Sequence, residues 1–259
     1  MTKALILAAG QGTRLRPITN DRPKCLVPFL GKTLLERQVA TLHAQNIRSI
    51  NIATGYRADQ IEALGFDTSF NHHFDKTNMV ESLFAAIDFL EHCNEDLIIA
   101  YGDIIYKEDN LKKLLASDGE IALMIDKNWL SLWSMRLDNP LDDAETLMIN
   151  EEGYITELGK KPEDYEKIQG QYTGLIKLRS DKISDFIKFY RELAKTADYD
   201  GNDFYNMYMT SFLQLLIDDN WKVKAAIVES GWLEVDSVDD LTTYERMAND
   251  GQLDGYFDK

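Results

Sequence analysis

Apolar runs and helix-like patterns alternate along the first part of the chain. Residues 3–9 form a nearly continuous apolar run, which is typical of a strand buried on both faces of a parallel sheet. Thr33 and Glu36 have the spacing of a capping box, and apolar residues then recur at helical spacing. The pattern therefore predicts a strand that runs into a glycine loop, followed by a helix near residues 34–45.

The same alternation continues to the end of the sequence. It predicts further strands at residues 47–54, 97–100, 120–126, 154–158, 172–178 and 222–228. It predicts further helices at residues 78–90, 182–194, 204–217 and 238–247. Strands separated by helices indicate one α/β domain over residues 1–259, with a doubly wound, mostly parallel but mixed sheet. Ligands of such a sheet bind at the carboxyl ends of its strands.

Composition and charge narrow the class of protein. The chain has 28 Lys and Arg residues against 44 Asp and Glu residues, a formal charge of −16, which argues against nucleic acid as a partner. The longest apolar stretch, residues 4–9, is far shorter than the roughly 20 residues that cross a bilayer. The N-terminus lacks the pattern of a secretory signal. We therefore expect a cytoplasmic protein with no membrane partner, and the sequence leaves a homo-oligomer open.

The cysteines and histidines do not indicate a metal centre. Cys25 and Cys93 cannot form a disulfide framework or a C-x-x-C cluster, so we expect two thiols that are buried or inert, in a reducing compartment. The four histidines lack the spacing of zinc ligands.

The loop after the first strand carries a concentration of positive charge. Its fifteen residues, Gly10 to Lys24, contain four basic residues and one acid, a charge of +3 in a chain whose remainder carries −19. Two glycines allow the backbone N–H groups to approach a ligand, and Arg14 and Lys24 add charged donors, as a phosphate requires. The loop does not fit a dinucleotide fingerprint, which needs a glycine in place of Leu15, and it does not fit a P-loop.

The residues of this loop carry a specific resemblance. Residues 7–15, with Pro17, Thr19 and Pro23-Lys24, resemble the signature of the nucleotidyltransferases that activate sugar phosphates and small phosphorylated alcohols. Further segments follow in that family's order over nearly the whole chain: Gly102-Asp103, residues 157–161, Tyr172-Thr173-Gly174 and residues 234–237. The resemblance implies a Rossmann-like (GT-A-like) fold with a small lid region. Residues 1–118 would be the nucleotide-binding half, and residues 119–259 the acceptor-binding and lid half.

Within that family, the chain is most similar to small bacterial CTP-dependent cytidylyltransferases of the phosphoglutamine or phosphocholine type. Residues 76–83 stand where hexose-phosphate members have a Gln-Pro-x-Gly-Leu-Ala stretch, and residues 126–146 and 206–210 resemble the phosphoglutamine type. The implied reaction transfers CMP from CTP to a small phosphorylated metabolite and releases pyrophosphate, in the synthesis of capsule or another cell-surface polysaccharide. Two alternatives stay open: a uridylyl- or thymidylyltransferase acting on a sugar 1-phosphate, and a CTP-binding subunit without catalysis.

The resemblance also implies roles for single residues. Asp103 and Asp236 match the magnesium ligands, Arg14 would face the leaving pyrophosphate, and Lys24 would face the α-phosphate and the attacking phosphate. The nucleotide would contact Leu7, Ala8, Ala9, Gly10, Gly12, Thr13, Gly55, Asn78 and Ser82. Asn78 and Ser82 could read the cytosine edge, although Asn78 could also serve only as a helix cap. No general base is needed, because a phosphate monoester with a second pKa of about 6 is largely ionised at neutral pH.

The acceptor side is less constrained by the sequence. The resemblance assigns Lys160, with Lys161 as the alternative, to the acceptor phosphate. The acceptor itself would contact Trp129, Arg136, Glu145 and Tyr172. Packing in the core and lid is an equal alternative for Trp129, as it is for Trp133 and Trp232. Solvent exposure is the alternative for Lys160.

Overall fold

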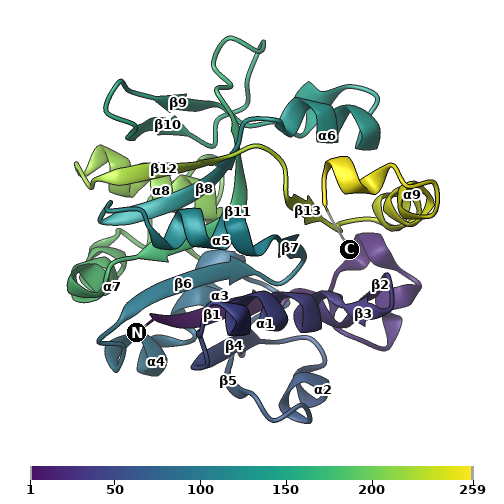
Figure 1. Cartoon of the computed structure of the whole chain (residues 1–259). Coiled ribbons are helices and arrows are strands. Elements are labelled where there is room, and N and C mark those ends of the chain that lie inside the picture. Colours follow the sequence, from purple (N-terminus) through teal and green to yellow (C-terminus); the bar gives the residue numbers. More distant parts are fainter. Residues whose placement is uncertain (1, 258–259) are drawn as a thin grey trace.

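Strand β1 (Thr2–Ala8), the first apolar run, lies inside a seven-stranded sheet. The computed structural model describes residues 2–257 (Figure 1). The strand order is β12-β8-β11-β6-β1-β4-β5. The other members are β4 (Ile50–Thr54), β5 (Asp67–Phe70), β6 (Asp96–Tyr101), β8 (Ile121–Asp126), β11 (Gln171–Leu178) and β12 (Val223–Val228).

The sheet is mostly parallel, as predicted. Only β11 runs antiparallel to its neighbours β6 and β8, whereas the other four pairings among these seven strands are parallel. Leu7 of β1 pairs with Tyr101 of β6, and Ala8 pairs with Thr54 of β4. The carboxyl ends of the three strands therefore meet at one edge of the sheet, where an α/β protein binds its ligands.

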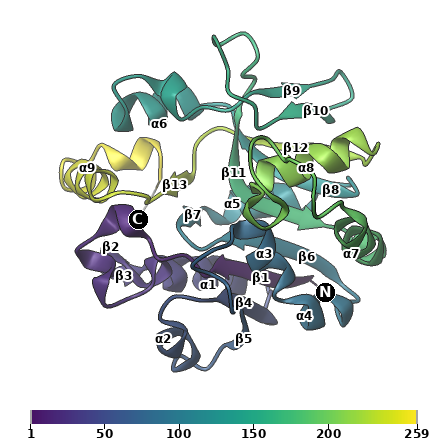
Figure 2. The same ribbon diagram turned by 180° about the vertical axis from the view of Figure 1, so that it is seen from behind.

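Helices cover both faces of the sheet, which explains why β1 is apolar at successive positions. Ala4 and Ile6 belong to one core with helices α1 (Leu34–Ala44) and α5 (Glu108–Leu115), in front in Figure 1. Leu5 belongs to the opposite core, seen from the front in Figure 2, which is covered by α3 (Met79–Phe84), α4 (Ile87–Glu91), α7 (Ile183–Glu192) and α8 (Met209–Asp218).

A smaller group of elements lies beyond the carboxyl edge of the sheet. It consists of helices α6 (Trp129–Arg136) and α9 (Val238–Asn249), the antiparallel pair β7 (Ile104–Tyr106) and β13 (Trp232–Glu234), and the hairpin β2 (Pro28–Phe29) and β3 (Lys32–Thr33). A second hairpin is formed by β9 (Leu147–Ile149) and β10 (Ile155–Leu158), and α2 (Ala58–Glu62) precedes β5. Figures 1 and 2 both show the N-terminal loop region beside α9.

Most predicted elements are confirmed, and two predicted helices are wrong in extent. Thr33 and Glu36 do form the capping box of α1. The helix predicted over residues 78–90 is divided into α3 and α4 at Ala85 and Ala86. The helix predicted over residues 204–217 begins only at Met209, because Asp203 caps a separate short turn and the two residues that follow that turn are not helical.

Two further observations concern the thiols and the membrane. Cys25 and Cys93 are free and buried, as predicted, and burial raises the pKa of the Cys25 thiol to about 12. Within residues 2–257, no helix has the length and apolar character needed to span a membrane.

Candidate active site

Gly102 and Asp103 follow directly after β6, against the end of β1. The N–H of Gly102 donates to the carbonyl of Leu7 at 2.9 Å, and a Cβ on Gly102 would lie only 2.7 Å from that oxygen. Glycine is therefore required where the two strand ends approach so closely. This contact places the side chain of Asp103 beside the start of the N-terminal loop.

Asp236 is brought to Asp103 by a short antiparallel pairing. β13 pairs with β7, with Glu234 opposite Ile104, and the N–H of Val235 donates to the carbonyl of Asp103 at 3.0 Å. The next residue along the chain is Asp236. Two aspartates that are far apart in the sequence thus lie on neighbouring backbone segments.

Lys24 joins the two carboxylates. Its Nζ donates to Asp103 Oδ2 and to Asp236 Oδ1, both at 2.6 Å. Burial alone would lower the pKa of Lys24, but the charges of Asp103 and Asp236 outweigh it and hold that pKa above its ordinary value. Gly12, with φ of +61°, makes room for this lysine, since a Cβ there would lie 3.0 Å from Lys24 Cβ. The predicted loop residue and both predicted aspartates therefore form one cluster.

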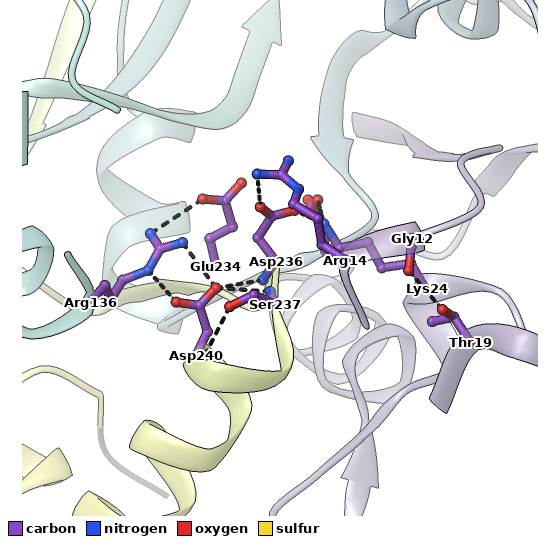
Figure 3. Close-up of polar contacts among 10 residues, drawn as sticks. Gly12, Arg14, Thr19, Lys24, Arg136, Glu234, Asp236, Ser237 and Asp240 are labelled. Carbon is purple, nitrogen blue, oxygen red and sulfur yellow. Dashed lines mark hydrogen bonds and ion pairs between the residues drawn. The ribbon is translucent and has the colours of Figure 1, made fainter. Parts of the chain in front are cut away.

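Arg14 approaches the same cluster from solvent. Its guanidinium forms an ion pair with Asp236 (Figure 3). The Arg14 side chain is 71% exposed. Among the described residues, the Arg14 side chain forms no other ion pair or hydrogen bond, so it can turn toward a ligand at low cost.

The cluster fits a hard divalent cation such as magnesium. Oδ1 of Asp103 is buried and has no hydrogen-bond partner among the described residues, and the Lys24 ammonium already supplies positive charge between the two carboxylates. No group of three or more His, Cys, Asp or Glu side chains in residues 2–257 could hold a metal ion. Two carboxylates suit magnesium, which takes its other ligands from phosphate and water.

A cavity opens beside Lys24 and Asp103. Predicted nucleotide contacts form much of its wall, namely Leu7, Ala8, Ala9, Gly10, Asn78 and Ser82. The cavity is also lined by Cys25, Phe74, Thr77, Met79, Tyr101 and Gly102. Its position at the carboxyl end of β1 and β6 is the place where a doubly wound sheet binds its ligand.

Asn78 and Ser82 both lie in this wall, and both already have protein partners. The side chain of Asn78 accepts from the N–H of Met79 at 2.8 Å and so caps α3, and its Nδ2 donates to the carbonyl of Asn206 at 3.3 Å. Ser82 Oγ accepts from Asn71 Nδ2 at 3.1 Å. The prediction that Asn78 caps a helix is thus confirmed. Because Asn78 also lines the cavity, it is placed where it could contact a base as well.

Comparison with known proteins identifies the family of the chain. Residues 4–143 match the family model of the MobA-like NTP transferase domain. The chain belongs to this nucleotidyltransferase family. It is also 43% identical, over 92% of its length and 97% of the relative, to the CTP:phosphoglutamine cytidylyltransferase of Campylobacter jejuni subsp. jejuni serotype O:2.

Solved structures share the fold of this nucleotidyltransferase. The inositol-1-phosphate CTP transferase from T. maritima has a TM-score of 0.71 at 23% identity, covering 99% of this chain and 98% of that one. The CTP:phosphocholine cytidylyltransferase from Streptococcus pneumoniae has a TM-score of 0.68 at 20% identity, covering 95% of this chain and 99% of that one.

Three of the predicted nucleotide contacts of this nucleotidyltransferase do not line the cavity. Gly12 packs against the side chain of Lys24, and Thr13 is exposed on the loop. Gly55 packs against Phe74, where a Cβ would lie 2.5 Å from the phenylalanine Cβ. Gly55 therefore acts on the cavity through Phe74, a wall residue that no sequence pattern indicates.

The predicted acceptor residues of the nucleotidyltransferase are placed in different surroundings. Lys160 is exposed and lies 3.9 Å from Glu157, outside the cavity wall, while Lys161 is held by the carbonyls of Leu141 and Asp142. Trp129 is buried in the core at 4% exposure, so it packs and does not form a wall of the cavity. Of the two alternatives for Trp129, the structure therefore shows packing in the core.

Glu145 and Tyr172 lie together deeper in the molecule. Thr210 Oγ1 donates to Glu145 at 3.2 Å, and burial, followed by the charges of Asp143 and Asp200, raises the pKa of Glu145. The Tyr172 ring meets the cavity residue Tyr101 edge to face at 5.8 Å between centroids. Tyr172 therefore lies next to the cavity wall at Tyr101, and neither Glu145 nor Tyr172 lines the cavity itself.

Arg136 has a position that the sequence did not suggest. It is bound by carboxylates of the nucleotidyltransferase itself: Nε lies 2.7 Å from Asp240 Oδ1, and Nη1 lies 3.4 Å from Glu234 Oε2. Glu234 in turn lies near Asp103 and Asp236. Burial raises the pKa of Glu234 to about 7, with a further contribution from Asp103, while Arg136 and Lys24 act in the opposite direction. The expected contact of Arg136 with a substrate is thus replaced by contacts within the protein.

Proposed function

We propose that this nucleotidyltransferase uses magnesium to transfer CMP from CTP to a small phosphorylated metabolite of the phosphoglutamine class, with release of pyrophosphate. The observation that carries the proposal is the meeting of Lys24, Asp103 and Asp236 at the mouth of the cavity. The choice of CTP and of the acceptor class is supported by the similarity to a protein named CTP:phosphoglutamine cytidylyltransferase.

The residues suit an in-line displacement at the α-phosphorus. An oxygen of the acceptor phosphate forms the new bond to that phosphorus, and the bond to the pyrophosphate oxygen breaks. Lys24 would release the carboxylates and place its ammonium on the α-phosphate and the attacking phosphate, and Arg14 would turn from Asp236 to the leaving pyrophosphate. Catalysis would then come from positioning and from neutralising negative charge, with no proton to remove.

Asp103 and Asp236 are the side chains that would hold magnesium. Bound there, the ion would neutralise charge on the triphosphate and polarise its oxygens. Asp103 Oδ1, which has no partner among the described residues, is available for this without breaking a hydrogen bond.

The cavity is assigned to the cytidine and the region beyond Tyr101 to the acceptor. Residues 1–118 would bind the nucleotide and residues 119–259 the acceptor. Lys160 would have to turn away from Glu157 to reach an acceptor phosphate, which its exposure permits. We further propose that the reaction takes place in the cytoplasm and serves the synthesis of a capsule or a related cell-surface polysaccharide.

A matrix of substrates tests the proposal directly. CTP, UTP, dTTP, ATP and GTP would each be combined with phosphoglutamine, phosphocholine, inositol 1-phosphate and glucose 1-phosphate, and pyrophosphate release would be measured with and without Mg²⁺. We expect Mg²⁺-dependent release that is fastest with CTP and phosphoglutamine. Preference for UTP or dTTP with glucose 1-phosphate would favour the sugar-phosphate alternative.

A binding measurement separates an enzyme from a subunit that only binds CTP. Calorimetric titration with CTP should show binding to the wild type and to Asp103→Asn, and turnover only for the wild type. Binding of CTP with no turnover of any acceptor by the wild type would contradict the proposed reaction.

A further inference from the structure

The backbone of Asp236 is fixed by the start of α9. Asp240 Oδ2 accepts from the N–H of Asp236 at 3.1 Å and from the N–H of Ser237 at 2.9 Å. Ser237 Oγ accepts from the N–H of Asp240 at 3.1 Å, which completes a capping box. A single carboxylate therefore determines both the helix start and the orientation of the residue that faces Lys24 (Figure 3).

Arg136 fixes that carboxylate with a forked pair of contacts. Its Nε donates to Asp240 Oδ1 at 2.7 Å and its Nη2 donates to Asp240 Oδ2 at 3.2 Å. Its third nitrogen, Nη1, lies 3.4 Å from Glu234 Oε2, on the other side of Asp236 in the sequence. The planar guanidinium thus binds Glu234 and Asp240, which lie on either side of Asp236 in the sequence, at the same time. An ammonium group could not do this with the same geometry.

The arginine is itself held in place by aromatic rings. Its guanidinium lies 5.4 Å from the ring centroid of Trp133, one helical turn before it on α6. The Trp133 ring stacks on Trp232, the first residue of β13, at 5.6 Å between centroids and 14° between planes. With a side chain only 4% exposed, Arg136 has no access to a diffusing ligand. Through the contacts of Trp133 with Trp232 and of Arg136 with Glu234 and Asp240, helix α6 packs against the segment that carries Asp236.

We infer that Arg136 is a positioning residue for the metal site: it acts through Asp240 and Glu234 to hold Asp236 in the orientation that binds the ion. The inference rests on the proposed role of Asp236 as a metal ligand. It assigns to α6, and to the pair formed by Arg136 and Asp240, a function in metal affinity in place of acceptor binding. Groups that orient metal ligands in this way typically contribute about 10- to 100-fold in affinity.

The test is the affinity for Mn²⁺, used as a spectroscopic substitute for Mg²⁺. Electron paramagnetic resonance would give the Mn²⁺ dissociation constant of the full-length protein saturated with CTP, after subtraction of the signal of Mn²⁺ and CTP alone. We expect Arg136→Met to weaken Mn²⁺ binding roughly 10- to 100-fold. Arg136→Lys should recover only part of the loss, because a lysine cannot form the fork.

Lys177→Met is the matched control. Lys177 is also a buried cation, with a side chain 9% exposed and 3.2 Å from Asp96, but Asp96 lies at the opposite end of β6 from Asp103. This variant should lose stability without changing the Mn²⁺ dissociation constant. A loss of affinity in Arg136→Met and not in Lys177→Met would assign the effect to the positioning of Asp236.

Three outcomes would overturn the inference, and the first of them would overturn the proposed metal site as well. If the wild type binds no Mn²⁺ beyond that bound by CTP, both the proposed metal site and the inference fail. If the wild type binds Mn²⁺ and folded Arg136→Met binds it equally well, only the inference fails. Should Arg136→Met not fold, Asp240→Asn removes the charge that Arg136 holds, and unchanged Mn²⁺ affinity in that variant would overturn the inference.

Discussion

The positive charges of the site come from a loop, whereas its carboxylates come from backbone that is fixed by strands and a helix start. The Arg14 side chain is 71% exposed, and within residues 2–257 its one ion pair is with Asp236. Asp236, by contrast, is 13% exposed and is flanked by β13 and α9, with Arg136 and Asp240 behind it. The loop and the carboxylate-bearing backbone contact each other through the ion pairs of Lys24 with Asp103 and Asp236.

This difference indicates how a triphosphate can enter. The loop cations are held mainly by the carboxylates, so a ligand with more negative charge can draw them away without unfolding a strand or helix. The backbone that carries the two carboxylates is held separately, by the pairing of β13 with β7 and by the start of α9, and would stay in place while the cations move. We therefore expect changes on the carboxylate side to abolish function, and changes on the loop side to have graded effects.

Asp236→Asn should produce the largest effect. It removes one of the two proposed magnesium ligands while keeping the size of the side chain, so we expect kcat/KM to fall on the order of 10³-fold with the fold retained. Steady-state kinetics with varied Mg²⁺, together with circular dichroism, would measure this. A variant that retains wild-type activity would refute the assignment of the metal site.

Lys24→Met should have the next largest effect and should also change stability. We expect kcat to fall roughly 10²-fold, because a group that offsets charge in the transition state is lost. Without ligand, Asp103 and Asp236 would face each other with no shared cation, so the melting temperature should fall. Mg²⁺ should then raise the melting temperature of Lys24→Met more than that of the wild type, since it replaces the missing charge. An equal response of the two proteins would show that Lys24 does not occupy the place of the metal.

The sequence predicted the loop side of this comparison better than the carboxylate side. Four basic residues within fifteen positions after an apolar run are a local signal, and the loop they form does carry Arg14 and Lys24 to the site. The capping box of Thr33 and Glu36 is equally local and was also correct. Asp103 and Asp236 were found through the family resemblance, because no local pattern relates two residues so far apart.

What the sequence missed depends on contacts between distant segments. The pairing of Arg136 with Asp240 joins α6 to α9, and a charged residue at the end of a helix gives no sign of such a partner. Strand β5 (Asp67–Phe70) was missed because it lies at the sheet edge and lacks an apolar run. Phe74 and Tyr101 enter the cavity wall only through the way the strand ends pack.

Asn78→Ala tests a residue that belongs to neither side of the ion-pair cluster, and its effect should be moderate. Loss of the cap of α3 should reduce stability by about 1 kcal/mol. If Asn78 also contacts the base, KM for CTP should rise up to about tenfold, the equivalent of one lost hydrogen bond. Thr33→Ala is the matched control, because it removes the cap of α1. Equal stability losses with a change of KM only in Asn78→Ala would establish base recognition, whereas unchanged KM in both would leave Asn78 as a cap alone.

Arg14→Ala should have the smallest effect and provides the finest test of the comparison. Because the Arg14 side chain is largely in solvent, its attraction to pyrophosphate is screened, and we expect kcat/KM to fall about fivefold or less. The difference from wild type should shrink as the salt concentration rises, since salt screens exposed charges most strongly. Arg22→Ala, in the same loop but paired with the neighbouring Asp21, should change kcat/KM less than Arg14→Ala does. A loss for Arg14→Ala as large as that for Asp236→Asn would mean that the loop is as tightly integrated as the carboxylate side, and the contrast between the two would have to be abandoned.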